Sequence, residues 1–286
     1  MSSLREIRKR LRSIQNIGQL TKAMEMVAAS HLHQAQARIQ QTLTYSTKIK
    51  EIVDSLTFNL TDFVHHLVEK KKQVRKIGVI VVAADMGLSG SYNKDVFNAA
   101  DRFLKTLPKE QVELILIGRL AVDHYSRRDW TIRFKNAKMV EAKRSQAVKS
   151  LTNQLINEYI QGDLDEVWLV YTQYISMFSK KVAVQKLLNI EISQDNPQGS
   201  KLNYIFEPAP EKILGEILLR YIFAKVQASL DEAYAAELAS RVFAMKAATK
   251  NADDMIEKLT LVRNKVRQSE ITKEMLEITA GAESAK

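Results

Sequence analysis

The chain has 286 residues, enough for one domain together with an extended element. It contains no cysteine, which excludes disulfides, thiolate metal sites and thiol switches. No apolar run reaches 18 residues and the start lacks the apolar core of a signal peptide, so we expect a cytoplasmic chain of bacterial type with no membrane span. The formal net charge of +10 favours nucleic acid, anionic lipid or an acidic protein surface as a partner.

The first segment has the pattern of one long amphipathic helix. No proline occurs before Pro108, and apolar residues recur three or four positions apart. This stripe comprises Leu4, Ile7, Leu11, Ile14, Ile17, Leu20, Met24, Val27, Ala28, Leu32, Ala35 and Ile39. We expect the stripe to drift around the helix between Ile14 and Ile17, beside Gly18, because that spacing breaks a seven-residue repeat and would locally unwind a supercoil.

The central segment alternates between strand and helix patterns. We expect strands at residues 77–84, 112–117, 166–171 and 181–188, the last as an edge or hairpin strand. Helices are expected at residues 96–104, 120–128 and 145–160. Continuous apolar runs such as the first two strands are typical of a parallel sheet buried on both faces. The sequence therefore predicts a layered, Rossmann-like α/β domain at residues 73–206.

The last segment has helical periodicity and no proline from residue 211 onward. Its stripe comprises Leu230, Tyr234, Leu238, Val242, Met245, Met255, Ile256, Leu259, Val262, Val266, Met275 and Ile278. About 65 helical residues span roughly 100 Å, which is longer than a globular core of this size. We therefore expect a helix over 210–286 that pairs with a helix over 1–60 as an antiparallel coiled coil mounted on the α/β domain.

The best candidate for a ligand site is the loop at residues 85–93, which follows the first strand and precedes a helix, where α/β sheets hold phosphate. Its sequence matches neither glycine-rich phosphate motif, so we favour a structural loop in which Ser91 or Asn93 caps the helix. The histidines form no metal-ligand motif. We expect no catalytic site, no cofactor site and no metal site.

Basic residues cluster at 5–12, 70–76 and 263–267. For the middle cluster we favour a solvated loop. Two other functions fit the charge and the fold class: a basic coiled-coil protein that binds nucleic acid, and a small α/β nucleotide-binding enzyme with helical arms.

Three stretches of the chain match sequences of a known protein family. The N-terminal match is Leu-Arg-Glu-Ile-Arg-Lys-Arg-Leu at 4–11, running on to Leu-Thr-Lys-Ala-Met-Glu-Met-Val-Ala-Ala-Ser at 20–30. The C-terminal match is Ser-Arg-Val-Phe-Ala-Met-Lys-Ala-Ala-Thr-Lys-Asn-Ala at 240–252, followed by Arg-Gln-Ser-Glu-Ile-Thr-Lys-Glu-Met-Leu-Glu-Ile at 267–278. The third match is Tyr-Ile-Phe-Glu-Pro at 204–208, which precedes the expected last helix. With these stretches, the chain resembles the gamma subunit of F-type ATP synthases over essentially its whole length.

This resemblance implies the central rotor shaft of the F1 sector. The coiled coil would stand inside a ring of alpha and beta subunits, and the base would sit on the membrane ring of c subunits beside epsilon. Rotation would couple ion flow to ATP synthesis and hydrolysis by the beta subunits, with no catalysis by this chain. The location would be peripheral, on the cytoplasmic face of the bacterial inner membrane.

The resemblance also implies which residues make contacts. The contacts with the alpha/beta ring would be Lys22, Met24, Arg241, Arg267, Gln268, Thr272 and Glu274, and those with the c ring would be Tyr204 and Glu207. From the residues alone, Met24 can instead be a coiled-coil core residue, and Arg241, Arg267 and Gln268 can be solvated. The chain departs from the family at Met86 and Ser89, where arginine and cysteine are usual.

Overall fold

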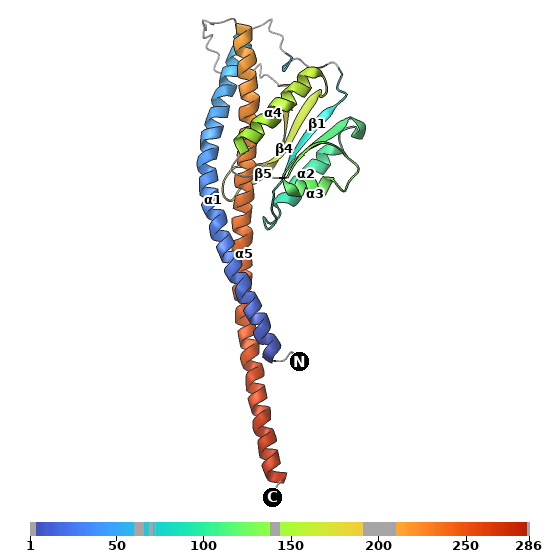
Figure 1. The fold of residues 1–286 in the computed structure, drawn as a ribbon. Helices are drawn as coiled ribbons and strands as arrows, with labels where there is room; N and C mark the ends of the chain where they lie inside the picture. Colours follow the sequence, from blue (N-terminus) through green and yellow to red (C-terminus); the bar gives the residue numbers. More distant parts are fainter. Residues whose placement is uncertain are drawn as a thin grey trace. The chain divides into compact units, whose positions relative to one another are not determined.

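The computed structural model describes residues 4–59, 66–68, 71, 73–137, 144–190 and 210–284. They fall into two compact units. We call Met1–Ala29 with Arg241–Lys286 the helical unit, and Ser30–Ser240 the sheet unit. The helices α1 (Leu4–Asn59) and α5 (Pro210–Ser284) each contribute to both units (Figure 1). The expected pair of long terminal helices is confirmed, and α5 begins at a proline, which suits a first helical position because it has no N–H to leave unpaired.

The sheet unit contains a mixed five-stranded sheet. Its strands are β1 (Ile77–Val82), β2 (Val112–Ile117), β3 (Thr131–Asn136), β4 (Glu166–Tyr174) and β5 (Lys180–Leu188). The spatial order is β3-β2-β1-β4-β5, in which the first four strands run parallel and β5 pairs antiparallel with β4. The predicted edge strand is thereby confirmed. β3 was not predicted from the sequence, because charged side chains such as Arg133 and Lys135 interrupt its apolar pattern.

Helices cover both faces of this sheet. They are α2 (Tyr92–Leu104), α3 (Arg119–Tyr125) and α4 (Arg144–Gln161), and a 3-10 turn, η1 (Lys109–Gln111), precedes β2. Successive residues of β1 enter opposite cores, as the two-residue period of a strand requires: Ile80 packs with α4 and α5, and Val79 with α2 and α3. Figure 1 shows α2 next to α3. The three predicted helices are confirmed: α2 ends at the expected residue, and the other helix ends are shifted by one to four residues.

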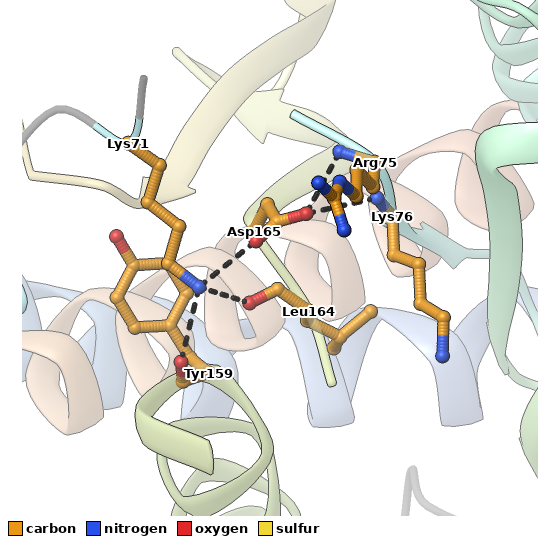
Figure 2. A network of polar contacts seen from close by, with 6 residues as sticks. All are labelled: Lys71, Arg75, Lys76, Tyr159, Leu164 and Asp165. Carbon is orange, nitrogen blue, oxygen red and sulfur yellow. Dashed lines mark hydrogen bonds and ion pairs between the residues drawn. The ribbon is translucent and has the colours of Figure 1, made fainter. Parts of the chain in front are cut away.

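Lys71 anchors the chain just before β1. Its Nζ lies 3.0 Å from Asp165 Oδ1 and donates to the carbonyl oxygens of Leu164 at 3.0 Å and Tyr159 at 3.4 Å (Figure 2). The N–H groups of Arg75 and Lys76 donate to Asp165 Oδ2 at 2.8 and 3.1 Å. The expectation of a solvated basic loop is therefore wrong for Lys71, because carbonyl and carboxylate oxygens between α4 and β4 replace water around its ammonium group.

The helical unit is an antiparallel coiled coil with an unbroken seven-residue repeat. On α1 the buried or half-buried positions of this face are 7, 11, 14, 18, 21, 25 and 28, and on α5 they are 242, 245, 249, 252, 256, 259, 263 and 266. Both series alternate steps of three and four residues, which keeps one seam facing the partner helix. Thr21 Oγ1 lies 2.9 Å from Thr249 Oγ1, and a Cβ built on Gly18 would lie 3.4 Å from that of Ala252.

The predicted drift beside Gly18 is wrong. Ile17, Leu20 and Val27 are 50, 60 and 57% exposed and lie off the seam. The seam instead passes through Gly18 and Thr21, which are buried. The true repeat could not be recognised in the sequence, because some seam positions carry small or polar residues. The exposed apolar residues beside them produced an apparent repeat shifted around the helix.

Candidate functional site

The loop after β1 is braced by its own polar groups. Asn93 lies inside α2, where its Oδ1 accepts the N–H of Ala84 at 2.9 Å and its Nδ2 donates to Ser89 Oγ at 3.1 Å. Asp85 Oδ1 accepts the N–H of Arg119 at 3.0 Å. These bonds tie the segment after β1 to α2 and to the first residue of α3, which supports the interpretation as a structural loop.

The predicted capping role is wrong in detail. Ser91 occupies the N-cap position of α2, but its side chain makes no capping bond. Its Oγ donates instead to Asp95 Oδ2 at 2.7 Å. The Ser91 hydroxyl therefore bonds to the carboxylate four residues along the chain and not to a backbone N–H of the first helical turn. Local side-chain hydrogen bonds commonly compete with backbone bonds in this way.

Gly118 sets the spacing between the carboxyl ends of β1 and β2. Its φ is +94°, and a Cβ at this position would lie 2.1 Å from the carbonyl oxygen of Ala83. Only glycine tolerates both conditions without strain. The close approach also allows the N–H of Ala83 to donate to the carbonyl oxygen of Ile117 at 2.9 Å.

The predicted contacts on α1 lie beside the seam of the coiled coil. Lys22 is exposed, and its Nζ lies 3.1 Å from Glu25 Oε2. Met24 is half-buried and occupies no seam position. It forms an outer stripe with Ile17, Leu20 and Val27, spaced three, four and three residues apart. The sequence analysis merged this outer stripe with the seam, and only knowledge of the true seven-residue repeat could have separated them.

A groove lies next to the seam within the helical unit. Its volume is about 750 Å³, and its lining includes Gln19, Lys22, Ala23, Met26 and Asp253. Gly18 also lines it, together with Thr249 from α5. Gly18 has no side chain and that of Ala23 is small, which leaves room for a hollow whose lining carries one lysine and one aspartate.

The predicted contacts on α5 fall into two environments. Arg241 is only 7% exposed, so the interpretation as a solvated charge is wrong. Arg267, Gln268, Thr272 and Glu274 are exposed, and Thr272 Oγ1 donates to the Gln268 carbonyl oxygen at 2.9 Å. Tyr204 and Glu207 lie outside the described residues. The structure thus groups Lys22 with Met24 on α1 and groups residues 267–274 on α5.

Apolar side chains are exposed along α5 of the helical unit as well. Those at least half exposed are Met255, Leu261, Ile271, Met275, Leu276 and Ile278. Every residue from 267 to 280 is exposed. The antiparallel seam places Leu4 level with Val266, so no α1 residue that the structure describes stands opposite this segment. Exposed apolar surface of this extent is typical of a protein interface.

The described residues contain neither a membrane-spanning helix nor a metal-binding cluster. None of their helices is long and apolar enough to cross a membrane. No group of three or more histidine, aspartate or glutamate side chains among them could hold a metal ion.

Comparison with known proteins identifies the family. A family model described as ATP synthase matches residues 3–285. The ATP synthase gamma chain of Protochlamydia amoebophila is 58% identical over 286 residues, covering 100% of both chains. The chain belongs to the ATP synthase gamma chain family. The gamma chain of Syntrophobacter fumaroxidans is 34% identical over 291 residues, also covering 100% of each chain.

Solved structures show the same fold. A chain of the Euglena gracilis mitochondrial ATP synthase, solved with OSCP, F1 and c-ring, matches with a TM-score of 0.66 at 17% identity, covering 98% of this chain and 94% of that one. A chain of the Tetrahymena thermophila central stalk and c-ring matches with a TM-score of 0.61 at 20% identity, covering 80% and 99%. Family membership makes the chain the central-stalk rotor of F1 and a non-catalytic subunit of the ATP synthase.

Proposed function

We propose that the chain transmits rotation between a membrane ring of c subunits and the catalytic beta subunits of its ATP synthase. The helical unit would turn inside a ring of alpha and beta subunits. The sheet unit would serve as the base, in contact with epsilon and the c ring. The complex would couple proton or sodium flow to ATP synthesis and hydrolysis, with this chain held peripherally on the cytoplasmic face of the bacterial inner membrane.

The observation that supports this proposal is the outer stripe of the helical unit. Ile17, Leu20, Met24 and Val27 lie outside the seam although they are apolar, and three of them are at least half exposed. A coiled coil with no further partner would place polar residues there, as soluble amphipathic helices do. A surrounding sleeve of subunits would cover the stripe and give it a function.

The physics of coupling requires such one-sided surface features. A partner shifts a conformational equilibrium only through contacts that differ between the two conformations. The outer stripe and the groove lie at particular angles around the helical unit, so subunits arranged in a ring would each meet a different surface. Turning the shaft would then present each beta subunit in sequence with the surface that favours its next conformation.

We assign the contacts accordingly. Lys22, Met24, Arg267, Gln268, Thr272 and Glu274 would meet the alpha/beta ring, and Tyr204 and Glu207 would meet the c ring. Arg241 is only 7% exposed, so it would meet the alpha/beta ring only through the small part of its side chain that reaches the surface. The exposed cations Lys22 and Arg267 would suit acidic loops of the ring. Such exposed ion pairs contribute little, typically up to about 1 kcal/mol, so they would not hold the rotor at one angle.

Reconstitution of the catalytic sector tests the proposal. Alpha and beta subunits from the same organism are co-expressed with and without the chain, and ATP hydrolysis is measured after size-exclusion chromatography. We expect a defined complex that contains the chain and hydrolyses ATP faster than alpha and beta alone. If the chain elutes separately and hydrolysis is unchanged, the proposal is wrong.

A further inference from the structure

The part of α5 that packs in the sheet unit is buried on almost every side. From Leu230 to Ser240 only Tyr234 is even half-exposed. Much of this surface is alanine, including Ala233, Ala235, Ala236 and Ala239. Helices and sheets fix their relative rotation through interlocking ridges of side chains, and alanines make only shallow ridges. Apolar packing alone therefore gives this segment a weak rotational register.

Several directional contacts reach the same segment from the rest of the sheet unit, and three of them come from β4, α2 and β5. Tyr171 OH on β4 donates to Glu232 Oε2 at 3.1 Å. Tyr92 OH at the start of α2 donates to the Ala233 carbonyl oxygen at 3.1 Å. Lys180 Nζ at the start of β5 donates to Ser240 Oγ. We call these three contacts the polar joint.

The side chains of the polar joint are buried except that of Lys180, which is exposed. Tyr92, Tyr171, Glu232 and Ser240 are each 6% exposed or less. The hydroxyl of Tyr171 also accepts from Gln185 Nε2 at 3.2 Å, so β5 supports the contact that β4 makes. Burial raises the pKa of the Glu232 carboxyl, although hydrogen bonds from Tyr171 and Gln173 oppose that rise. A carboxyl group buried at this cost contributes less to stability than an apolar side chain of similar size would.

We propose that the polar joint fixes the angular register of α5 on the sheet and is where torque passes between the base and the shaft. Tyr171 and Glu232 are its central positioning residues. Hydrogen bonds depend steeply on angle, whereas apolar contacts between smooth surfaces do not. Three such bonds from β4, α2 and β5, distributed over Glu232 to Ser240, oppose rotation of α5 about its own axis. This inference rests on the proposed function as a rotor.

The test removes both partners of the central contact together, and the half-buried amides of Gln173 and Gln185 each lose one hydrogen bond to them. The double variant Tyr171→Phe/Glu232→Met deletes both partners while nearly preserving volume, which limits the loss of stability. The matched control is Thr172→Val, because Thr172 neighbours Tyr171 on β4, is 2% exposed and has a hydroxyl with no hydrogen-bond partner. Each variant is assembled into the complete ATP synthase and reconstituted in liposomes.

The measured quantity is the number of ions pumped per ATP hydrolysed, alongside hydrolysis by the detached F1 sector. Slippage at the joint appears only under load, so we expect at least a roughly twofold fall in ions pumped per ATP for the double variant. Hydrolysis by its detached F1 should stay at the wild-type rate, and Thr172→Val should match the wild type in both measurements. A wild-type pumping ratio in the assembled double variant would overturn the inference.

Failure of the variant to assemble and failure of the proposed function can each be distinguished from failure of the inference. If the double variant does not assemble, Tyr171→Phe alone is measured, and a wild-type pumping ratio there overturns the inference as well. If the wild-type chain itself supports no pumping, the proposed function fails and the joint has no torque to transmit.

Discussion

Thr21 and Thr249 face each other across the two helices of the helical unit, with their hydroxyl oxygens 2.9 Å apart. Each hydroxyl also contacts its own helix: Thr21 Oγ1 lies 3.1 Å from the Gly18 carbonyl oxygen, and Thr249 Oγ1 lies 3.0 Å from that of Met245. Gly18 and Ala252 form the neighbouring pair, so this layer of the seam consists of two polar and two small residues. The helices approach closely here and bury little apolar surface.

Replacing both hydroxyls should cost little. In Thr21→Val/Thr249→Val no hydroxyl loses its partner, and we expect a free energy of unfolding within about 1 kcal/mol of the wild type or above it. Each single change leaves the other hydroxyl with only its backbone contact and should cost up to about 1 kcal/mol. Denaturant unfolding of the four chains forms a double-mutant cycle that measures the coupling. A double variant less stable than either single variant would contradict this account of the seam.

Gly118→Ala should destabilise the sheet unit. A Cβ would lie 2.1 Å from the Ala83 carbonyl oxygen at a φ of +94°, so the ends of β1 and β2 must separate. Strain of this kind costs on the order of 1–3 kcal/mol before the clash is counted. Gly87→Ala is the control, because no atom lies within 4 Å of its added Cβ. Thermal unfolding should show a lower Tm for Gly118→Ala alone, and equal Tm values would refute the close approach.

The free energy of unfolding should depend on pH through the ionisation of the Asp165 carboxyl group. Partial burial acts to raise its pKa, but hydrogen bonds from the Arg75 N–H, the Lys71 ammonium and the Lys76 N–H lower the pKa below its ordinary value. A lowered folded-state pKa stabilises the fold above the unfolded-state pKa, and this stabilisation is lost as the pH falls through the folded-state value.

The wild type should therefore exceed Asp165→Asn in free energy of unfolding by about 1–3 kcal/mol near neutral pH. The difference should shrink toward acid, as the carboxyl becomes protonated. Urea unfolding at about pH 7 and about pH 3 checks this slope. A difference that stays constant with pH would show that the carboxylate charge is not what matters at this position.

Met24→Lys should impair coupling without preventing assembly. The side chain lies on the outer stripe and not in the seam, so a lysine there can extend into solvent. We expect ATP synthesis by the complete complex to fall severalfold, because a buried contact of this kind at an interface is worth about 2 kcal/mol. Leu43→Lys is the control, an exposed α1 residue of the sheet unit outside the proposed contacts. Failure of Met24→Lys to assemble would place Met24 in a structural core.

The sequence predicted the elements whose local pattern matches their environment. β1 is a continuous apolar run and β2 is apolar except at Glu113, because both faces of these strands are buried, and α5 is free of proline after its first residue. β3 escaped prediction because it is a partly exposed edge strand whose Arg133 bonds to Glu113 and Glu158 instead of entering a core.

The functional surface was harder to predict than the fold. Gly18 and Thr21 are seam residues with little or no apolar surface, whereas Ile17 and Leu20 are apolar residues exposed to solvent. Hydrophobic periodicity therefore placed the seam on the wrong side of α1 at this point. The polar joint left no periodic signal, because Glu232 is an acidic residue that tertiary packing buries. The domain boundaries at 1–60, 73–206 and 210–286 and the subunit contacts stay predictions.

Direct observation of rotation tests the central claim most sharply. An F1 complex of alpha, beta and this chain is immobilised through beta, and a probe is attached to a single cysteine introduced at exposed Lys94 of the sheet unit, because the chain has no native cysteine. The account predicts stepwise rotation of the probe in one direction when ATP is added, stopping when ATP is removed. ATP hydrolysis by a complex whose probe stays at a fixed angle would contradict the account.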